Sequence, residues 1–225
     1  PLAEETGTIL ALGRWMLTEA CREAAQWRQT WAAAKPLVLT INLAAAQLQQ
    51  TDFIDELQLL LEETGFPAHQ LVLELTETAM FHDTQRTISQ LQDLRALGVR
   101  IAIDDFGTGY SSLGYLRRFQ VDMLKIAREI VRPGGGGNEA WAVARAIVAL
   151  GQTLDLGVVA EGIEDEAQAR YLRELGCRFG QGYHFARPTD GATLALRAFG
   201  GADGQTRIIE FPHTAGVDLL GVPGI

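Results

Sequence analysis

The sequence predicts an α/β fold, and two regularities favour a (β/α)8 barrel within that class. Short apolar segments rich in β-branched residues alternate with longer segments that have helical periodicity, the pattern of βαβ units around a parallel sheet. In addition, nearly every expected strand carries a polar or charged residue at its C-terminal end. All strand C-termini of a barrel meet on one face, where an active site forms, whereas an open sheet gathers ligand groups from two or three strands. Contributions from six strands therefore favour the barrel.

The elements alternate along the chain as such a barrel requires. The expected strands are runs of Leu, Val, Ile and Thr or short apolar segments, at about 37–44, 70–76, 99–104, 121–126, 157–162 and, less clearly, 177–185. Between them lie amphipathic patterns that predict helices at about 8–33, 52–64, 82–97, 139–155 and 165–175.

Two segments fall outside this alternation. Residues 133–138 contain four consecutive glycines and predict a flexible connection, because no GK[ST] sequence or strand-to-helix glycine spacing of a phosphate loop accompanies them. The tail is rich in glycine, with one strand-like piece at 206–211. An edge strand, a connection to another domain and disorder all fit this tail. We therefore expect a barrel over residues 1–199 and a C-terminal extension or linker over residues 200–225.

Composition and charge exclude several classes of protein. The chain has 225 residues, of which 47% are hydrophobic and 21% charged, as is typical of a globular domain with a full core. A formal charge of −9 argues against binding to a DNA or RNA polymer. No apolar run has the length of a membrane span, and Cys21 and Cys177 are too far apart to form a ligand pair. We expect reduced thiols and a cytoplasmic protein, or the cytoplasmic domain of a membrane-anchored one.

The most informative segment is the adjacent pair Asp104-Asp105, which follows an apolar strand and opens a loop with glycines at 107 and 109. Neighbouring carboxylates repel each other, so a bound cation is the simplest explanation for keeping both. The other strand ends contribute Asn42, Glu74, Lys125, Glu161 and Gln181.

These side chains suit Mg²⁺ or Mn²⁺, which prefer hard oxygen ligands, and the lack of a Cys/His cluster argues against zinc. Taken singly, Asn42 and Gln181 would also suit turns, Glu74 an exposed strand position, and Lys125 a surface lysine. Glu161 and Glu164 would also suit a solvated helix start. Their joint position at one barrel face favours a site.

Six ordered motifs resemble those of the EAL-domain family of bacterial cyclic di-GMP phosphodiesterases, and the match runs from residue 1 to about 198. They are Ile41-Asn42-Leu-Ala, Glu74-Leu-Thr-Glu77, Asp104-Asp105-Phe-Gly-Thr-Gly-Tyr-Ser-Ser-Leu113, Val121-Asp-Met-Leu-Lys125-Ile, Ala160-Glu161-Gly-Ile-Glu164 and Gln181-Gly-Tyr-His-Phe-Ala-Arg-Pro188. The resemblance implies a modified TIM barrel that converts cyclic di-GMP to 5′-pGpG with two Mg²⁺ or Mn²⁺ ions. It implies that Asn42, Glu74 and Asp104 bind one ion, and that Asp105 binds the second, with Asp104 bridging.

The resemblance also implies roles for five further residues. Lys125 and Glu161 match a catalytic pair beside the attacking water, and Gln181 matches a residue that contacts substrate. Glu77 and Glu164 match residues that anchor the loop after Asp105. Family members are often homodimers, and many carry a sensor or diguanylate-cyclase domain in the same polypeptide.

Two departures from the family pattern limit the expected activity. The Glu-Ala-Leu motif, which supplies a metal-ligating glutamate in the family, does not occur in this sequence. We expect that it precedes Pro1 in the natural protein, that residues 1–225 form the barrel without its N-terminal strands, and that they hydrolyse poorly alone. The family usually has aspartate after Lys-Ile, where this chain has Ala127.

The leading prediction is therefore a two-metal cyclic di-GMP phosphodiesterase at the C-terminal face of the barrel. The alternative is a catalytically weak or inactive receptor for cyclic di-GMP, which Ala127 favours and the intact Asp104-Asp105 loop disfavours. A third hypothesis is a different metal-using barrel that acts on a carboxylate or sugar.

Overall fold

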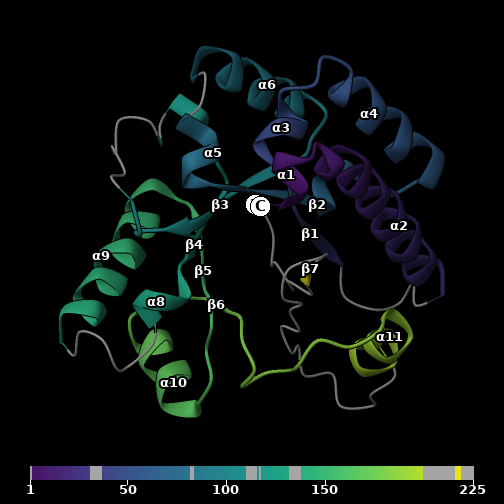
Figure 1. Ribbon diagram of the computed structural model, residues 1–225. Helices are drawn as coiled ribbons and strands as arrows, with labels where there is room; N and C mark the ends of the chain where they lie inside the picture. The colour runs from purple at the N-terminus through teal and green to yellow at the C-terminus, as the bar shows by residue number, and fades with distance from the viewer. Residues whose placement is uncertain are drawn as a thin grey trace.

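A computed structural model shows a curved sheet with the order β6-β5-β4-β3-β2-β1-β7. It describes residues 2–30, 37–81, 84–109, 116, 118–131, 138–199 and 216–218. The sheet curves around the middle of the molecule, and helices lie along its outer side (Figure 1). This is part of a TIM-like (β/α) barrel, as predicted.

The six predicted strands are present, and neighbours in the order β1 to β6 pair in parallel. Their bounds are β1 Val38–Asn42, β2 Leu71–Thr76, β3 Arg100–Phe106, β4 Met123–Ile126, β5 Gly157–Ala160 and β6 Phe179–Gly180. A further strand, β7 Gly216–Asp218, pairs antiparallel with the outer edge of β1.

The five predicted helices are also present, as α2 Thr8–Thr30, α4 Phe53–Thr64, α6 Thr84–Ala96, α9 Asn138–Leu154 and α10 Glu166–Glu174. Local chemistry sets several of their ends. α4 stops at Gly65, whose φ of 67° is left-handed and costs glycine little. α10 starts at Asp165, whose side chain accepts a hydrogen bond from the backbone N–H of Gln168 in a capping box.

The described residues also contain short elements that the sequence pattern did not predict. They are α1 Leu2–Glu5, α3 Ala45–Leu48, the 3-10 turn Ala68–Gln70, α5 Glu77–Phe81, α8 Arg128–Val131 and α11 Gly191–Phe199. Most of them contain only one turn, which is too short for an apolar periodicity to appear.

The strands are apolar on both faces, as expected for strands buried between helices and a barrel interior. Residues such as Leu39, Leu73 and Ile101 belong to the large cluster that packs against the helices. A second, smaller cluster lies on the other face and contains Val38, Val72, Ala102, Met123 and Val159, with Phe179 packed against it. We call this second cluster the inner layer.

Several predictions fall on residues outside the described part of the chain. These are the glycines at 134–137, the strand-like piece at 206–211 and the loop residues 110–113. Within the described ranges, no helix combines the length and apolar character needed to span a bilayer. Cys21 and Cys177 are buried free thiols, and burial raises their pKa to about 12 and about 11.

Candidate functional site

The strand-end residues form a polar level directly above the inner layer. Strand side chains alternate between faces, so a residue two positions further along points the same way. Five of the predicted site residues stand two positions after a member of the inner layer or its packed neighbour: Glu74 after Val72, Asp104 after Ala102, Lys125 after Met123, Glu161 after Val159 and Gln181 after Phe179. The sixth, Asn42, ends β1 and is paired in register with Glu74.

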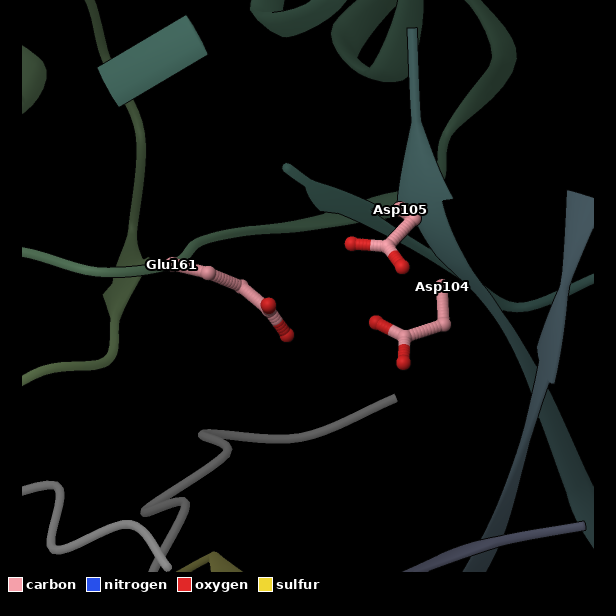
Figure 2. A group of neighbouring side chains, drawn as sticks. All are labelled: Asp104, Asp105 and Glu161. Carbon is pink, nitrogen blue, oxygen red and sulfur yellow. The ribbon is translucent and has the colours of Figure 1, made fainter. Parts of the chain in front are cut away.

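A local irregularity allows both aspartates to face this level. The register of β3 against β4 shifts between Ile103 and Phe106, and Asp105 has a φ of 53°. In a regular strand the side chains of residues 104 and 105 would lie on opposite faces. Here the carboxylates of Asp104, Asp105 and Glu161 point toward one another from the ends of β3 and β5 (Figure 2), with one ligand atom of each within 4.8 Å of the others.

Lys125 lies among three carboxylates. Its Nζ is 2.8 Å from Oε2 of Glu74, 3.2 Å from Oδ1 of Asp104 and 2.5 Å from Oε1 of Glu161. The side chains of Lys125 and Glu74 are each only 6% exposed. Such a buried cluster is stable only while the charges compensate each other closely.

The acids outnumber the one ammonium group, and their pKa values reflect this. Burial raises the pKa of Glu74, the nearby charge of Asp104 adds to that effect, and Lys125 opposes it. Burial likewise raises the pKa of Glu161 to about 8, opposed by Lys125 and increased by Asp104 and Glu74. The positive charge of Lys125 is therefore too small to compensate the negative charges of Glu74 and Glu161 together.

This donor set fits a divalent cation. Asp104, Asp105 and Glu161 offer carboxylate oxygens to one point, and Glu74 and Asn42 stand on the adjacent strands. These are the hard oxygen ligands that Mg²⁺ and Mn²⁺ select, and a cation would supply the missing positive charge.

The predicted loop anchors lie in different surroundings. Glu77 is buried at the start of α5, and its carboxylate faces the backbone of Gly109, where an added Cβ would lie 3.0 Å from Oε1. Glu164 instead forms an ion pair with Arg128. Because residues 110–113 lie outside the described ranges, the anchoring roles of both glutamates stay predictions.

Gln181 connects the last two strands at the same level. Its backbone N–H donates to Ala160 O at 2.8 Å, and its carbonyl accepts from the N–H of Ile163 at 2.8 Å. Its side-chain Oε1 is buried and has no hydrogen-bond partner among the described residues. A free acceptor in this position is available to a ligand or an ordered water.

Ala127 follows β4 and is completely buried in the large cluster. Its N–H lies 3.5 Å from the carbonyl of Phe106, which follows the two aspartates. The effect of having alanine here stays a prediction. The sequence prediction did not single out Arg128, although Gly162, next to Glu161, indicates a tight turn that a neighbouring side chain could cover.

Comparisons with known proteins identify the family of this chain. The family model for the EAL domain matches residues 1–188. The chain is 43% identical over 189 residues to the bifunctional diguanylate cyclase/cyclic di-GMP phosphodiesterase MucR of Pseudomonas aeruginosa, covering 84% of this chain and 27% of MucR. It is 42% identical over 200 residues to the cyclic di-GMP phosphodiesterase NbdA of the same organism, covering 88% of this chain and 25% of NbdA. The chain thus spans about a quarter of the length of these relatives.

Solved structures show the same fold. The complex of the MucR phosphodiesterase with c-di-GMP superposes with a TM-score of 0.79 at 41% identity, over 86% of this chain and 84% of that one. Klebsiella pneumoniae BlrP1, in a manganese/cy-diGMP complex, gives a TM-score of 0.67 at 32% identity, over 78% of this chain and 45% of that one.

Proposed function

Because this chain belongs to the EAL domain family, we propose that it hydrolyses cyclic di-GMP to 5′-pGpG in second-messenger signalling. The observation that carries the proposal is Lys125 among Glu74, Asp104 and Glu161, beside Asp105. The relatives named as cyclic di-GMP phosphodiesterases and the c-di-GMP complex of MucR support it.

In this proposal, Asn42, Glu74, Asp104 and Asp105 would hold two Mg²⁺ or Mn²⁺ ions. Two such ions, when bound, lower the pKa of a shared water and stabilise charge on the attacking and leaving oxygens. The excess of negative charge at the site and the manganese complex of BlrP1 support a divalent ion.

The chain's own side chains complete the reaction in this proposal. The oxygen of a water attacks one phosphorus, the P–O3′ bond breaks, and the 3′ oxygen takes up a proton, so one linkage opens. Lys125 neutralises charge that develops on the phosphoryl oxygens, and Glu161 holds the ammonium group in position at 2.5 Å. Gln181 offers its amide oxygen, which no described residue contacts by a hydrogen bond, to substrate or ordered water, while Glu77 and Glu164 steady the loop after Asp105.

Purified full-length protein incubated with cyclic di-GMP and Mn²⁺ should yield 5′-pGpG, detected by chromatography, and Asp104→Asn in the same protein should yield none. Nucleotide binding is measured in parallel by calorimetry with Ca²⁺. If the unmodified protein gives no product while it binds cyclic di-GMP, hydrolysis is the wrong function and a receptor remains.

That second function is favoured by one observation, the buried alanine at position 127. An aspartate there would add a negative charge beside the metal-binding end of β3. Ala127→Asp should raise the turnover of a weak enzyme, whereas a receptor that lacks further catalytic groups should stay inactive.

We also propose the wider setting of the chain. MucR is named as both a cyclase and a phosphodiesterase, which supports a role as one domain of a larger signalling protein. The division into a barrel over 1–199 and an extension over 200–225, the homodimer and the cytoplasmic location stay predictions. Light scattering of the full-length protein tests the dimer.

A further inference from the structure

The turn that carries Glu161 is held by its backbone at two points. The N–H of Glu161 donates to Ile126 O at 3.1 Å, and the N–H of Ile163 donates to Gln181 O at 2.8 Å. Between them, Gly162 has a φ of 68°, a left-handed conformation that favours glycine. A small rotation of this turn would move the Glu161 carboxylate away from Lys125.

The side chain of Arg128 covers the turn. An added Cβ on Gly162 would lie 2.1 Å from Cγ, 2.8 Å from Cβ and 2.9 Å from Cδ of Arg128, so the aliphatic stem rests on the Gly162 backbone. The guanidinium group reaches the far end of the turn and pairs with Glu164. Its Nε is buried and has no hydrogen-bond partner within the described ranges. Arg128 therefore touches the turn on both sides of Ile163.

Arg128 is also close in the chain to Lys125, which forms the proposed catalytic pair with Glu161. It is the first residue of α8 and follows Lys125 by three positions, after the end of β4. The segment that carries Lys125 is thus packed through Arg128 against the segment that carries Glu161.

We propose that Arg128 is a positioning residue, which holds the turn at residues 161–164 so that the Glu161 carboxylate stays on Lys125 Nζ. This inference rests on the proposed catalytic role of Glu161. The half-exposed ion pair with Glu164 contributes little by itself, since solvent screens such pairs. The stem on Gly162 is the larger part of the effect.

Kinetics test the proposal with Arg128→Ala, which removes stem and charge, and Arg128→Met, which keeps a stem. Because a misplacement of about 1 Å costs up to about 10²-fold, we expect Arg128→Ala to lower kcat about tenfold, with KM within about twofold. Arg128→Met should recover most of kcat. Arg173→Ala is the control, because it breaks an exposed ion pair with Glu166 within α10 and leaves Arg128 in place.

Amide hydrogen exchange gives a readout that needs no activity. In Arg128→Ala the amides of Glu161 and Ile163 should exchange about tenfold faster, while Arg173→Ala leaves them unchanged. If the unmodified protein fails to hydrolyse cyclic di-GMP, the proposed function fails and exchange alone decides on positioning. Equal exchange and equal kcat in Arg128→Ala and Arg173→Ala would overturn the proposal. If Arg128→Ala does not fold, Arg128→Met tests the proposal. The proposal requires that the amides of Glu161 and Ile163 in Arg128→Met exchange at the same rates as in the unmodified protein, and faster exchange would contradict it.

Discussion

At the scale of single residues, Lys125 is the group on which the other site side chains depend. Three carboxylates lie within 3.2 Å of its Nζ, and the side chain is 6% exposed. The sequence pattern and the family resemblance related Lys125 to Glu161 alone. Its contacts with Glu74 and Asp104 arise because β2, β3 and β4 are neighbours in the sheet, which no local pattern encodes.

Replacing Lys125 with methionine should therefore affect both stability and activity. The acids would lose their compensating charge, and breaking a buried pair costs roughly 3–5 kcal/mol. We expect a loss of that order in chemical denaturation of the metal-free protein at pH 8, together with loss of hydrolysis. Arg173→Ala, which breaks an exposed pair, should change the unfolding free energy by less than about 1 kcal/mol. A Lys125→Met protein as stable as the unmodified one would contradict this account.

The raised pKa of Glu161 leads us to predict that the stability of the folded protein depends on pH. Burial raises its pKa from 4.5 to about 8, so between these values the folded state binds a proton that the unfolded state has lost. The stabilisation from the protonated carboxyl is complete below pH 4.5 and is lost as pH rises through 8.

The melting temperature of metal-free protein should therefore fall from pH 5 to pH 9 more steeply than that of Glu161→Gln. Saturating Mn²⁺ should flatten the profile of the unmodified protein, because the ion replaces the proton. Parallel profiles for the two proteins in EDTA would show that Glu161 does not carry this pH dependence.

At the scale of elements, periodicity was enough to predict the six parallel strands and five long helices, but not the irregular end of β3. The strand was expected to stop at residue 104, and it continues to Phe106 through a register shift. An insertion of this kind leaves no mark in the apolar pattern, because it changes which way residue 105 points without changing its type. The one-turn elements α3, α5 and α8 were missed because they are too short to show a period.

Because β3 is irregular at Asp105, we predict that substitutions of this residue change stability and activity independently of each other. Its φ of 53° suits glycine, so Asp105→Gly should keep or slightly raise stability, by up to about 1 kcal/mol, while it removes a metal ligand and the activity. Asp105→Val should lose both, because a β-branched residue is strained in this conformation.

Asp155→Gly is the matched control for this prediction. Asp155 has a φ of 56° and lies at the end of α9, away from the site. It should show the same change in thermal stability with unchanged hydrolysis. If Asp105→Gly keeps the activity, Asp105 is not a metal ligand.

At the scale of the whole molecule, the sheet is curved but not closed within the described residues, since β6 pairs only with β5 and β7 only with β1. The sequence allowed the sequential order of strands β1 to β6 to be predicted, because neighbouring strands of a barrel follow one another in the chain. The pairing of residues 216–218 with β1 was not predictable, because it joins segments far apart in the chain and the segment is only three residues long.

The contact between β7 and β1 predicts a role for the tail in preventing association. Open strand edges pair readily with other chains, and β7 covers the edge of β1 over Val38, Leu39 and Thr40. Deletion of residues 216–225 should therefore promote self-association at high concentration, measured by light scattering. Val217→Pro should do the same more weakly, because proline cannot donate to the ladder. Unchanged mass for both variants across concentrations would show that β7 does not protect this edge.

The two-residue step between the inner layer and the polar level also constrains how such a protein can change over generations. Inserting or deleting one residue within β2 or β4 would turn Glu74 or Lys125 toward the helices and bring a leucine or isoleucine inward. The same change within β5 would turn Glu161 away and bring Ala160 or Gly162 into its place. A protein with such an insertion or deletion would lose its site side chains and the packing of its inner layer at the same time. Replacing a single side chain leaves the alternation intact, so catalysis can be lost while the barrel, and any nucleotide binding it supports, is inherited.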